Sequence, residues 1–477
     1  MSPERQVYLL DPQCLKPEVI AVVFAKTSRS PQSFREIAAE LTDEKSAEFH
    51  EKWVVGYGHS SVAEHAVLHI AVENLSRLAV ETLESNRLAS YTEKSTRYQK
   101  WGPSDFYVPP ELNDHLLLPV YLQTCQALFD AYQVALPLVR GVIAAQNPPK
   151  PGESERAFEA RIRSDYIDVC RFLLPAASLA NVGMTINARA LEHAIQKMLS
   201  HPLEEVRQLG SDIKNVAMAE VPTLIKYANA VPYLENARST MLAEAAGLEP
   251  ASRTSGDWCR LIAFDPQSEE RLLAAALFRF GDGDYAQYFE RVRQLPLAER
   301  QRLAQALLGS AEKFDIPLRE LEHAAYTFEL VMDQGACFEF KRHRMLTLTA
   351  QPLTTHLGYA TPCAFLEAGM KNQFRQAMSL AAETYEKLCA FNPEVASYVV
   401  PNAFNRRLLF TLNLRSADHL IALRSAPNAH FSIRRAAHRL AQEIREVTPL
   451  LGSCLREAGG ETWQDVEAKF FASTGSY

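Results

Sequence analysis

Residues 64–66 read Glu-His-Ala, and the same tripeptide returns at residues 322–324. Four further landmarks recur in the same order along the chain. They are Asp11-Pro12-Gln13 with Asp265-Pro266-Gln267, Arg87 with Arg344, Pro175 with Pro401, and Asn187-Ala188-Arg189 with Asn413-Leu414-Arg415. One tripeptide match arises by chance, but five matches in one order predict an internal duplication. The sequence therefore indicates two related halves.

The spacing of these landmarks places the domain boundaries. The first three pairs lie 254 to 258 residues apart and the last two lie 226 apart, so one segment differs in length. The extra residues fall in the first half between about 100 and 165, where 147–155 has the composition of an exposed loop. We predict a first domain over 1–245, a linker over 246–257 and a second domain over 258–477.

The periodicity predicts both strands and helices in each half. We expect an α+β fold in which each half contains a mixed sheet flanked by long helices. In each half a short apolar run, which ends before Asp11 or at Phe264, is predicted to form a strand. The other expected elements come in pairs. They are helices over 34–54 and 298–313, strands over 66–73 and 324–331, helices over 76–88 and 333–344, helices that begin near Asn187 and Asn413, and helices over 203–218 and 430–446.

Composition is that of a globular protein of 477 residues with a formal charge of −7. This charge argues against broad binding to nucleic acid or to a membrane surface. We found no apolar run of the roughly 18–20 residues that a membrane span needs. The eight cysteines have neither a metal-site spacing nor a disulfide pattern, and the N-terminus has no signal-peptide pattern, so we expect a cytoplasmic protein without a metal.

The densest basic cluster is Lys341-Arg342-His343-Arg344, which follows an apolar segment. One interpretation is a solvated helix end, where cations complement the helix dipole. The other is an edge that binds an anion and a ring, because arginine offers a planar fork to phosphate and histidine can contact a heteroaromatic ring. The residues alone leave both interpretations open.

The corresponding place in the first half begins at Glu84 and continues into a polar stretch, Glu93-Lys94-Ser95-Thr96-Arg97-Tyr98. A turn that presents the Ser95 hydroxyl, backbone N–H groups and Arg97 together suits a phosphate monoester. The alternative is an ordinary polar turn. There is no glycine-rich phosphate loop in the chain, so side chains would have to hold any phosphate.

Together, these motifs resemble the signature of flavin-dependent thymidylate synthases. The signature contains Arg-His-Arg, a downstream Ser-x-Arg-Tyr, a preceding segment like Gly58-His59-Ser60-Ser61-Val62-Ala63-Glu64-His65, and a following Asn-x-Arg. The resemblance covers 5–230 and 258–457 as two copies. It implies FAD as cofactor, NADPH and methylenetetrahydrofolate as co-substrates, and a family homotetramer with sites shared among subunits. We therefore expect a homodimer with a pseudo-tetrameric arrangement of half-domains.

The resemblance assigns different roles to the two copies. The second copy keeps Arg342, His343 and Arg344, and Arg424 stands where an arginine faces the pyrimidine. It loses the phosphate loop, since Ala350, Pro352 and Thr354 replace the expected Glu, Ser and Arg, and Ser397 replaces a helix arginine.

The first copy has the opposite pattern. It keeps the residues that the resemblance assigns to the nucleotide, which are Glu93, Ser95, Thr96, Arg97 and Arg171. Ser85-Asn86 replace Arg-His, and Lys197 or Met198 replaces the pyrimidine-facing arginine. Each copy has lost what the other retains, which favours a division of labour over the decay of one copy.

The implied flavin contacts are distributed over both copies. Besides Arg342, His343 and Arg344, they are Ser61, Glu64, Asn187, Arg189, Asn413 and Arg415. One departure concerns Glu339, which stands at the family's glutamine position. A carboxylate there repels a phosphate unless it is protonated or paired.

Two functions follow as hypotheses. The first is a flavoenzyme that transfers a one-carbon unit to C5 of dUMP or a related uracil nucleotide, with Arg424 as the catalytic cation beside the ring. The second is a non-catalytic nucleotide- or flavin-binding pseudoenzyme, or an assembly protein, derived from that family.

Overall fold

The computed structural model describes residues 6, 8, 10, 12, 14–28, 30–247 and 257–472. The chain forms two compact units, and each is built from several segments. Unit 1 contains Met1–Lys94, Phe106–Leu118 and Ser178–Pro250, and unit 2 contains Ser95–Asp105, Pro119–Ala177 and Ala251–Tyr477. The predicted linker lies mostly outside the described residues, as do Asp11 and Gln13. The domain boundaries at 245 and 258 stay a prediction about the two copies.

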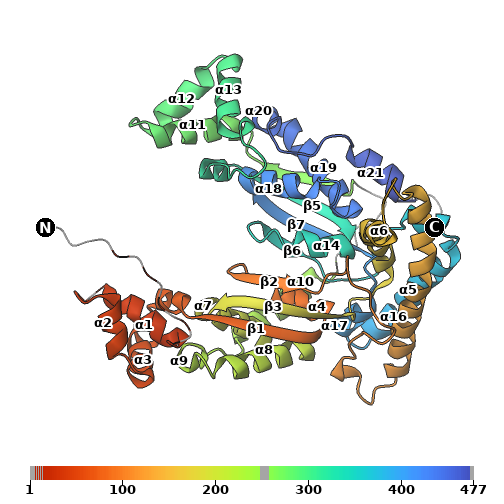
Figure 1. The fold of residues 1–477 in the computed structure, drawn as a ribbon, viewed down its shortest axis with the longest axis horizontal. Helices are drawn as coiled ribbons and strands as arrows, with labels where there is room; N and C mark the ends of the chain where they lie inside the picture. Colours follow the sequence, from red (N-terminus) through yellow and green to blue (C-terminus); the bar gives the residue numbers. More distant parts are fainter. Residues whose placement is uncertain are drawn as a thin grey trace. The chain divides into compact units, whose positions relative to one another are not determined.

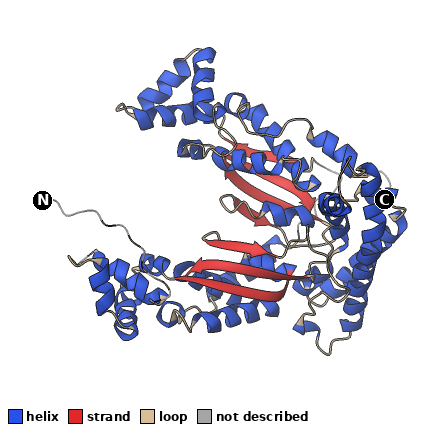
Figure 2. Ribbon diagram, viewed as in Figure 1, coloured by secondary structure: helices blue, strands red, loops and turns tan. Residues whose placement is uncertain are grey.

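The predicted α+β class is confirmed, but the sheets are antiparallel rather than mixed. Figure 2 shows the strands as two separate small sheets within the described chain. Unit 1 holds β1 (Val67–Ser76), β3 (Leu179–Asn187) and β2 (Ala89–Glu93) in that order. Unit 2 holds β4 (Cys259–Phe264), β5 (Ala325–Asp333), β7 (Asn405–Asn413) and β6 (Thr347–Ala350) in that order.

The strand registers repeat between the two sheets. Val67 faces Asn187 in unit 1, and Ala325 faces Asn413 in unit 2. Ser90 faces Thr185, and Thr347 faces Thr411. The second member of each pair lies 226 residues after its first-copy counterpart, as the landmark spacing requires. One register shift, between Val72 and Leu75, distinguishes β1 from β5.

Unit 1 packs amphipathic helices against its sheet. α7 (Ala188–Leu199) and α8 (Glu204–Ala217) follow β3 and lie along one face of the sheet (Figure 1). Leu191, Ile195 and Met198 of α7 are buried at helical spacing. The remaining elements are α1 (Pro17–Thr27), α2 (Phe34–Glu40), α3 (Asp43–Phe49), a π-helix (His50–Gly56), 3-10 turns (Ser60–His65 and Pro110–Leu112), α4 (Arg77–Leu83), α9 (Pro222–Ile225) and α10 (Pro232–Ala245).

The core of unit 2 lies between its sheet and α19 (Phe431–Val447). Alternate residues of β5 and β7 point into this core, and the rings of Phe328 and Phe410 stack 5.5 Å apart. Ile433, Leu440 and Ile444 of α19 are buried in the same core. Burying each such side chain contributes about 1.5–3 kcal/mol, so this core fixes the strand ends that carry the site.

The other elements of unit 2 complete the fold around this core. They are α5 (Leu118–Gln146), α6 (Glu155–Cys170), a 3-10 turn (Arg171–Leu173), α11 (Ser268–Phe280), α12 (Tyr285–Gln294), α13 (Leu297–Ala304), a π-helix (Gln305–Gly309), 3-10 turns (Arg319–His323 and Ser397–Val399), α14 (Gln334–Phe340), α15 (Cys363–Glu367), α16 (Lys371–Cys389), α17 (Pro393–Ala396), α18 (Leu414–Arg424), α20 (Pro449–Gly452) and α21 (Trp463–Phe470).

Helix α5 differs most from what the sequence led us to expect. Within the described part of the chain it is the one helix long and apolar enough to cross a membrane by length and composition. Our search for an uninterrupted apolar run missed it because polar residues such as Gln126 and Asp130 interrupt the sequence. It buries one face, and its Thr124 hydroxyl is hydrogen-bonded to that of Thr384 on α16 at 2.8 Å. We therefore interpret α5 as a core helix of unit 2.

Most of the expected helices are present but several are shorter. The predicted helices over 76–88 and 333–344 end at Leu83 and Phe340. The stretch 34–54 is divided into α2, α3 and a π-helix, and 298–313 likewise changes from α-helix to π-helix at Gln305. The π-helices occupy corresponding places in the two copies, so the copies share even this irregularity.

Candidate functional site

An ion pair joins the Ser95–Asp105 segment to the end of α6 in unit 2. Arg97 donates from Nε to the carboxylate of Asp168 at 2.9 Å and from a terminal nitrogen at 2.8 Å. The same guanidinium donates to the carbonyl of Asn428 at 3.1 Å. The backbone N–H of Arg97 donates to the Ser95 hydroxyl at 3.2 Å, so the turn that holds this arginine is itself ordered.

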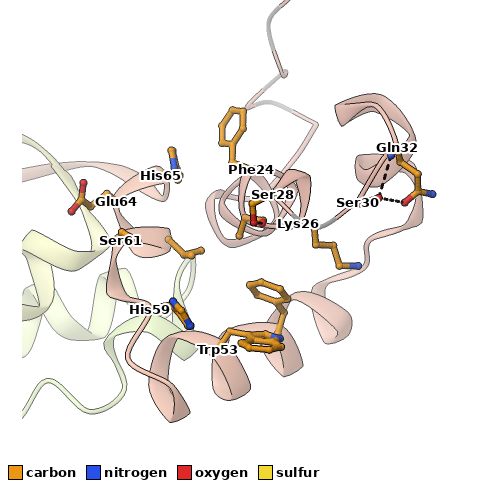
Figure 3. Close-up of a pocket in the computed structure, with 13 residues that line it drawn as sticks. Phe24, Lys26, Ser28, Ser30, Gln32, Trp53, His59, Ser61, Glu64 and His65 are labelled. Atoms are coloured by element: carbon orange, nitrogen blue, oxygen red, sulfur yellow. Dashed lines mark hydrogen bonds between the residues drawn. The ribbon is translucent and has the colours of Figure 1, made fainter.

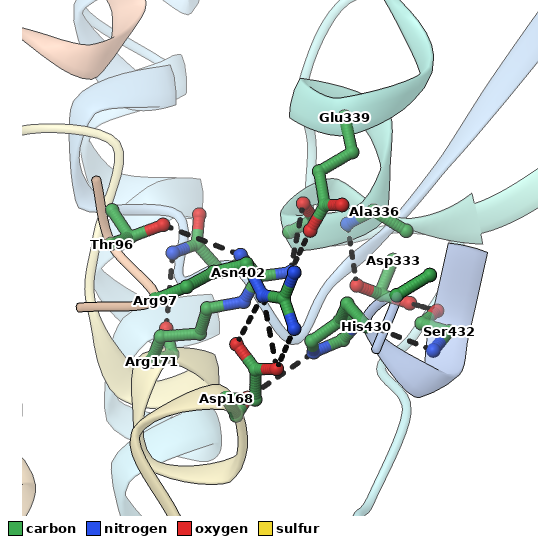
Figure 4. A network of polar contacts seen from close by, with 12 residues as sticks. Thr96, Arg97, Asp168, Arg171, Asp333, Ala336, Glu339, Asn402, His430 and Ser432 are labelled. Carbon is green, nitrogen blue, oxygen red and sulfur yellow. Dashed lines mark hydrogen bonds and ion pairs between the residues drawn. The ribbon is translucent and has the colours of Figure 1, made fainter. Parts of the chain in front are cut away.

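Arg171 follows α6 directly and is buried, with 2% of its side chain exposed. Its guanidinium donates to the Thr96 hydroxyl at 3.3 Å, to the carbonyl of Gly335 at 3.4 Å and to the carboxylate of Glu339 at 3.0 Å. Figure 4 shows these side chains converging. A first-copy arginine thus reaches residues of the second copy within one compact unit.

The second-copy side of the cluster comes from α14 and α18. Asp333 caps α14 by accepting the N–H of Ala336 at 2.9 Å, and Glu339 lies in the last turn of that helix. Arg424 ends α18 and donates to the Glu339 carboxylate at 3.1 Å and to the Glu339 carbonyl at 3.4 Å. Its Nε donates to Nε2 of His343 at 2.9 Å.

These contacts fix the charge of two groups in the cluster. Burial would raise the pKa of Glu339, but Arg171, Arg97 and Arg424 outweigh burial and hold that pKa below its ordinary value. Burial, with Arg424 and His419 nearby, lowers the pKa of His343 to about 3. His343 is therefore a neutral acceptor for Arg424, and Glu339 is an ionised carboxylate between arginines.

His430 packs beside the cluster as a buried histidine. Its ring lies against Phe172 and Phe431, and its Nε2 lies 3.3 Å from the carbonyl of Asp168. Burial, together with Arg171 and Arg97, holds its pKa well below 6.5. His430 is thus a packed residue, and it caps the start of α19, which begins at Phe431 rather than at the predicted residue 430.

The two copies also meet through backbone pairs that obey a local two-fold symmetry. Ala176 donates to the carbonyl of Val400 at 3.0 Å, and Asn402 donates to that of Leu174 at 2.9 Å. Residues 176 and 402, like 174 and 400, differ by 226 positions, so the two bonds are symmetry equivalents. Pro175 bridges Pro401 between them. Such an isologous contact is the geometry of a two-fold dimer interface, here formed within one chain.

The remaining residues predicted to bind the nucleotide or the flavin fall in different places. Ser95 is half-buried and Thr96 is buried in unit 2. Arg342 is exposed and Arg344 is half-buried at the end of α14. Glu93 lies in unit 1, where its carboxylate is buried in an ion pair with Arg77.

Ser61 and Glu64, two of the predicted flavin contacts, line a cavity of about 610 Å³ in unit 1 (Figure 3). Its walls come from α1, the π-helix and the 3-10 turn that contains Ser61. Aromatic rings and hydroxyls dominate the lining, including Trp53, His59 and Ser28. A cavity of this size and composition matches ligand pockets in general.

The two Asn-x-Arg segments have equivalent local structures. Asn187 caps α7 by accepting the N–H of Ala190 at 2.9 Å, and Asn413 caps α18 by accepting the N–H of Ser416 at 2.8 Å. Arg189 pairs with Glu64. In the second copy Arg415 pairs with Glu322 at 2.7 Å.

The comparisons with known proteins agree with this architecture. The family model for the thymidylate synthase complementing protein matches residues 10–223 and 260–450. The chain belongs to this family. It is 32% identical to a UPF0159 protein of Chlamydia muridarum over 435 residues, which is 87% of this chain and 82% of that relative.

Two further relatives align with this chain over different lengths. A UPF0159 protein of Thermoplasma acidophilum is 27% identical over 462 residues, 87% of this chain and 90% of its own length. A flavin-dependent thymidylate synthase of Clostridium tetani is 27% identical over 214 residues, 44% of this chain and 82% of its own length. Most of the length of this synthase thus aligns with less than half of this chain, as a duplication predicts.

Sequence reasoning missed Asp168, which holds Arg97 in place. One signal was present, because Asp168 lies three residues before Arg171 and the two therefore share one face at the end of a helix. Asn402 was also missed. It donates to the carbonyl of Arg171 at 3.0 Å, a contact that no local sequence pattern indicates.

Proposed function

We propose that the chain is a flavin-dependent enzyme that transfers a one-carbon unit to C5 of dUMP or a related uracil nucleotide, at one hybrid site per chain. The observation that carries the proposal is the junction of Arg171 from the first copy with Glu339 and Arg424 from the second. The resemblance assigns these arginines to opposite ends of one nucleotide. Random decay of a duplicate gives no reason for the retained halves to meet.

In this proposal Arg97 and Arg171 bind the nucleotide phosphate. The unit-2 geometry is consistent with the role, because both guanidiniums are positioned by fixed partners and approach one another in Figure 4. Phosphate binding orients the pyrimidine and converts binding energy into positioning.

Arg424 is the proposed cation at the ring. A charge that develops on the pyrimidine carbonyl edge during attack by C5 would be stabilised by a guanidinium that is already oriented. The neutral imidazole of His343 does not offset the charge of this arginine, which is paired with the carboxylate of Glu339. No cysteine nucleophile is needed in this scheme.

FAD is the proposed cofactor, with NADPH as reductant and methylenetetrahydrofolate as one-carbon donor. When bound, the flavin supplies the hydride that reduces the transferred carbon to a methyl group. The residues proposed to hold it are Ser61, Glu64, Asn187, Arg189, Arg342, His343, Arg344, Asn413 and Arg415. The fit rests on the aromatic and hydroxyl lining of the cavity that contains Ser61 and Glu64. A homodimer would supply four half-domains, as in the family's homotetramer.

The direct test is formation of dTMP from dUMP, methylenetetrahydrofolate and NADPH by the purified protein. Arg424→Ala should lower kcat at least a hundredfold, which is the order of loss when a preorganised charge-stabilising donor is removed. Thr354→Ala, on the degenerate loop of the second copy, should retain activity. Light scattering should report a dimer at micromolar concentration; a stable monomer would count against the proposed assembly.

A second candidate is a pseudoenzyme that binds nucleotide or flavin without turnover. The observation that favours it is the carboxylate of Glu339, which already engages two of the arginines. Protein that is yellow and binds dUMP but forms no dTMP with any reductant would support this candidate over the enzyme.

A further inference from the structure

Glu339 occupies the point where the two copies' arginines converge. One carboxylate oxygen accepts from Arg171 at 3.0 Å and the other accepts from Arg424 at 3.1 Å. The residue is 4% exposed. Each oxygen therefore faces a guanidinium from a different copy.

The cluster is close to internally neutral. Among the described residues that make these contacts, Arg97, Arg171 and Arg424 face two carboxylates, those of Asp168 and Glu339. Asp168 takes two nitrogens of Arg97, and Glu339 takes the remaining two arginines. A site built to receive a dianionic phosphate gains most from uncompensated cations. In this cluster two carboxylates already accept hydrogen bonds from all three arginines.

We propose that Glu339 is a specificity-determining residue that competes, from within the chain, with the phosphate of an incoming nucleotide. This inference rests on the proposed function, in which the cluster receives a nucleotide monophosphate. Binding then requires Arg171 to exchange its contact with Glu339 for one with the phosphate. The carboxylate remains bonded to Arg424 and repels the phosphate at short range in a water-poor site.

A neutral side chain of the same shape would act in the opposite way. The glutamine amide keeps an oxygen for one arginine and offers an N–H donor where the carboxylate repels an anion. Glu339→Gln should therefore strengthen binding of the phosphate without changing the space available to the base. The effect should be confined to ligands that carry the phosphate.

The test compares dUMP with deoxyuridine by calorimetry on the flavin-loaded full chain. The ratio of Kd for deoxyuridine to Kd for dUMP measures what the phosphate contributes. In Glu339→Gln this ratio should rise at least tenfold over wild type. Inorganic phosphate should also bind at least tenfold more tightly to the variant.

Glu329→Gln is the matched control, because it removes one carboxylate charge from unit 2 away from the cluster. Glu329 lies on β5 and pairs with Arg407 and Arg260. In Glu329→Gln the ratio of Kd for deoxyuridine to Kd for dUMP should remain within about twofold of the wild-type ratio. Glu339→Met, which is neutral and similar in length, serves if the glutamine variant fails to fold, and it should raise the ratio in the same direction.

An unchanged or lower ratio in the Glu339 variant, with dUMP still bound, would overturn the inference while leaving the proposed function intact. Absence of dUMP binding and of dTMP formation in wild type and variants would overturn both. The two failures are therefore distinguishable in one set of measurements.

Discussion

The C-terminal end of α14 with the residues that follow it forms the second-copy edge, and the end of α4 with the residues that follow it forms the first-copy edge. These two edges share a fold position and differ in chemistry. In the second copy Glu339 lies in the last turn of α14, His343 follows the helix, and Arg424 contacts both of them. In the first copy Lys197 donates to Ser85 at 2.7 Å and to Asn86 at 3.1 Å, and burial lowers the pKa of this lysine. The first-copy edge thus satisfies its cation with neutral partners and offers no guanidinium or imidazole at these positions.

A buried contact elsewhere shows that the scaffold has changed less than the site. Ser76 caps α4 and donates to the Glu205 carboxylate at 2.6 Å. Asp333 caps α14 at the equivalent position, and Ser432 donates to it. In the first copy the hydroxyl caps the helix and the acid lies on the later helix, and in the second copy the acid caps the helix and the hydroxyl lies on the later helix. The hydrogen bond between them is present in both copies. The comparison indicates that packing constrains both copies equally, whereas the chemistry of the edge is free to diverge.

The largest expected difference between the edges concerns flavin. Arg344→Ala should reduce FAD content to less than about a tenth of wild type, because it removes a local cation in a chain of negative net charge. His343→Ala should have a similar effect, because it removes the neutral ring that is proposed to contact the flavin. FAD released on denaturation and measured by absorbance checks this. The double variant Ser85→Ala with Asn86→Ala should keep nearly full flavin content. Loss of flavin from that variant instead would show that the first-copy edge binds it, with Arg87 as the candidate cation.

Next in size is the difference between the stability lost by the protein on Arg171→Ala and the stability lost on substitution of the counterpart, Ser397→Ala. Arg171→Ala leaves the buried carboxylate of Glu339 without one of its partners, and breaking a buried pair in this way costs about 3–5 kcal/mol. Ser397 donates only to the carbonyl of Leu353 at 2.9 Å. Ser397→Ala should therefore cost about 1 kcal/mol. Denaturant unfolding of both variants measures the gap, and equal costs would refute the proposed asymmetry.

Nucleotide affinity should distinguish Arg97 from Thr354, its counterpart in the second copy. Arg97→Ala removes a charge-assisted phosphate contact and should weaken dUMP binding at least tenfold while flavin content stays nearly constant. Thr354→Ala should change the affinity less than about twofold. Since Arg97→Ala also leaves Asp168 without its partner, the double variant with Asp168→Asn controls for that charge. Undiminished affinity in both Arg97 variants would place the phosphate elsewhere.

The smallest predicted effect is a pH dependence of the folding stability that arises from His343 at the second-copy edge. The pKa of His343 is about 3 in the folded chain against an ordinary value of 6.5. The unfolded chain therefore takes up this proton first as the pH falls, and the contribution of His343 to stability, complete above pH 6.5, is lost progressively below it.

Between pH 7.5 and pH 6 the loss should be about 1 kcal/mol. His343→Gln keeps an acceptor for Arg424 but cannot titrate, so its stability should fall less over this range. Parallel stability curves for variant and wild type would mean that His343 titrates normally.

Much of the fold was predictable because the duplication leaves marks at fixed spacing. The capping residues Asn187 and Asn413 and the strands that begin near 67 and 325 follow from local patterns. Strands β2 and β6 were not predicted because they are short, and β3 and β7 were not predicted because each leads directly into a helix with a stronger pattern. The ion pairs of Asp168 and Glu339 depend on segments that are distant in sequence, and only tertiary structure brings those segments together.

The central claim is that two copies with complementary losses make one hybrid site in each chain. The number of FAD molecules bound per chain at saturation tests this most directly, measured on protein whose concentration is fixed by amino-acid analysis. With one hybrid site in each chain, we expect about one FAD per chain. Two per chain would contradict it, because both edges would then be functional, and protein that takes up no FAD would contradict the flavoenzyme proposal itself.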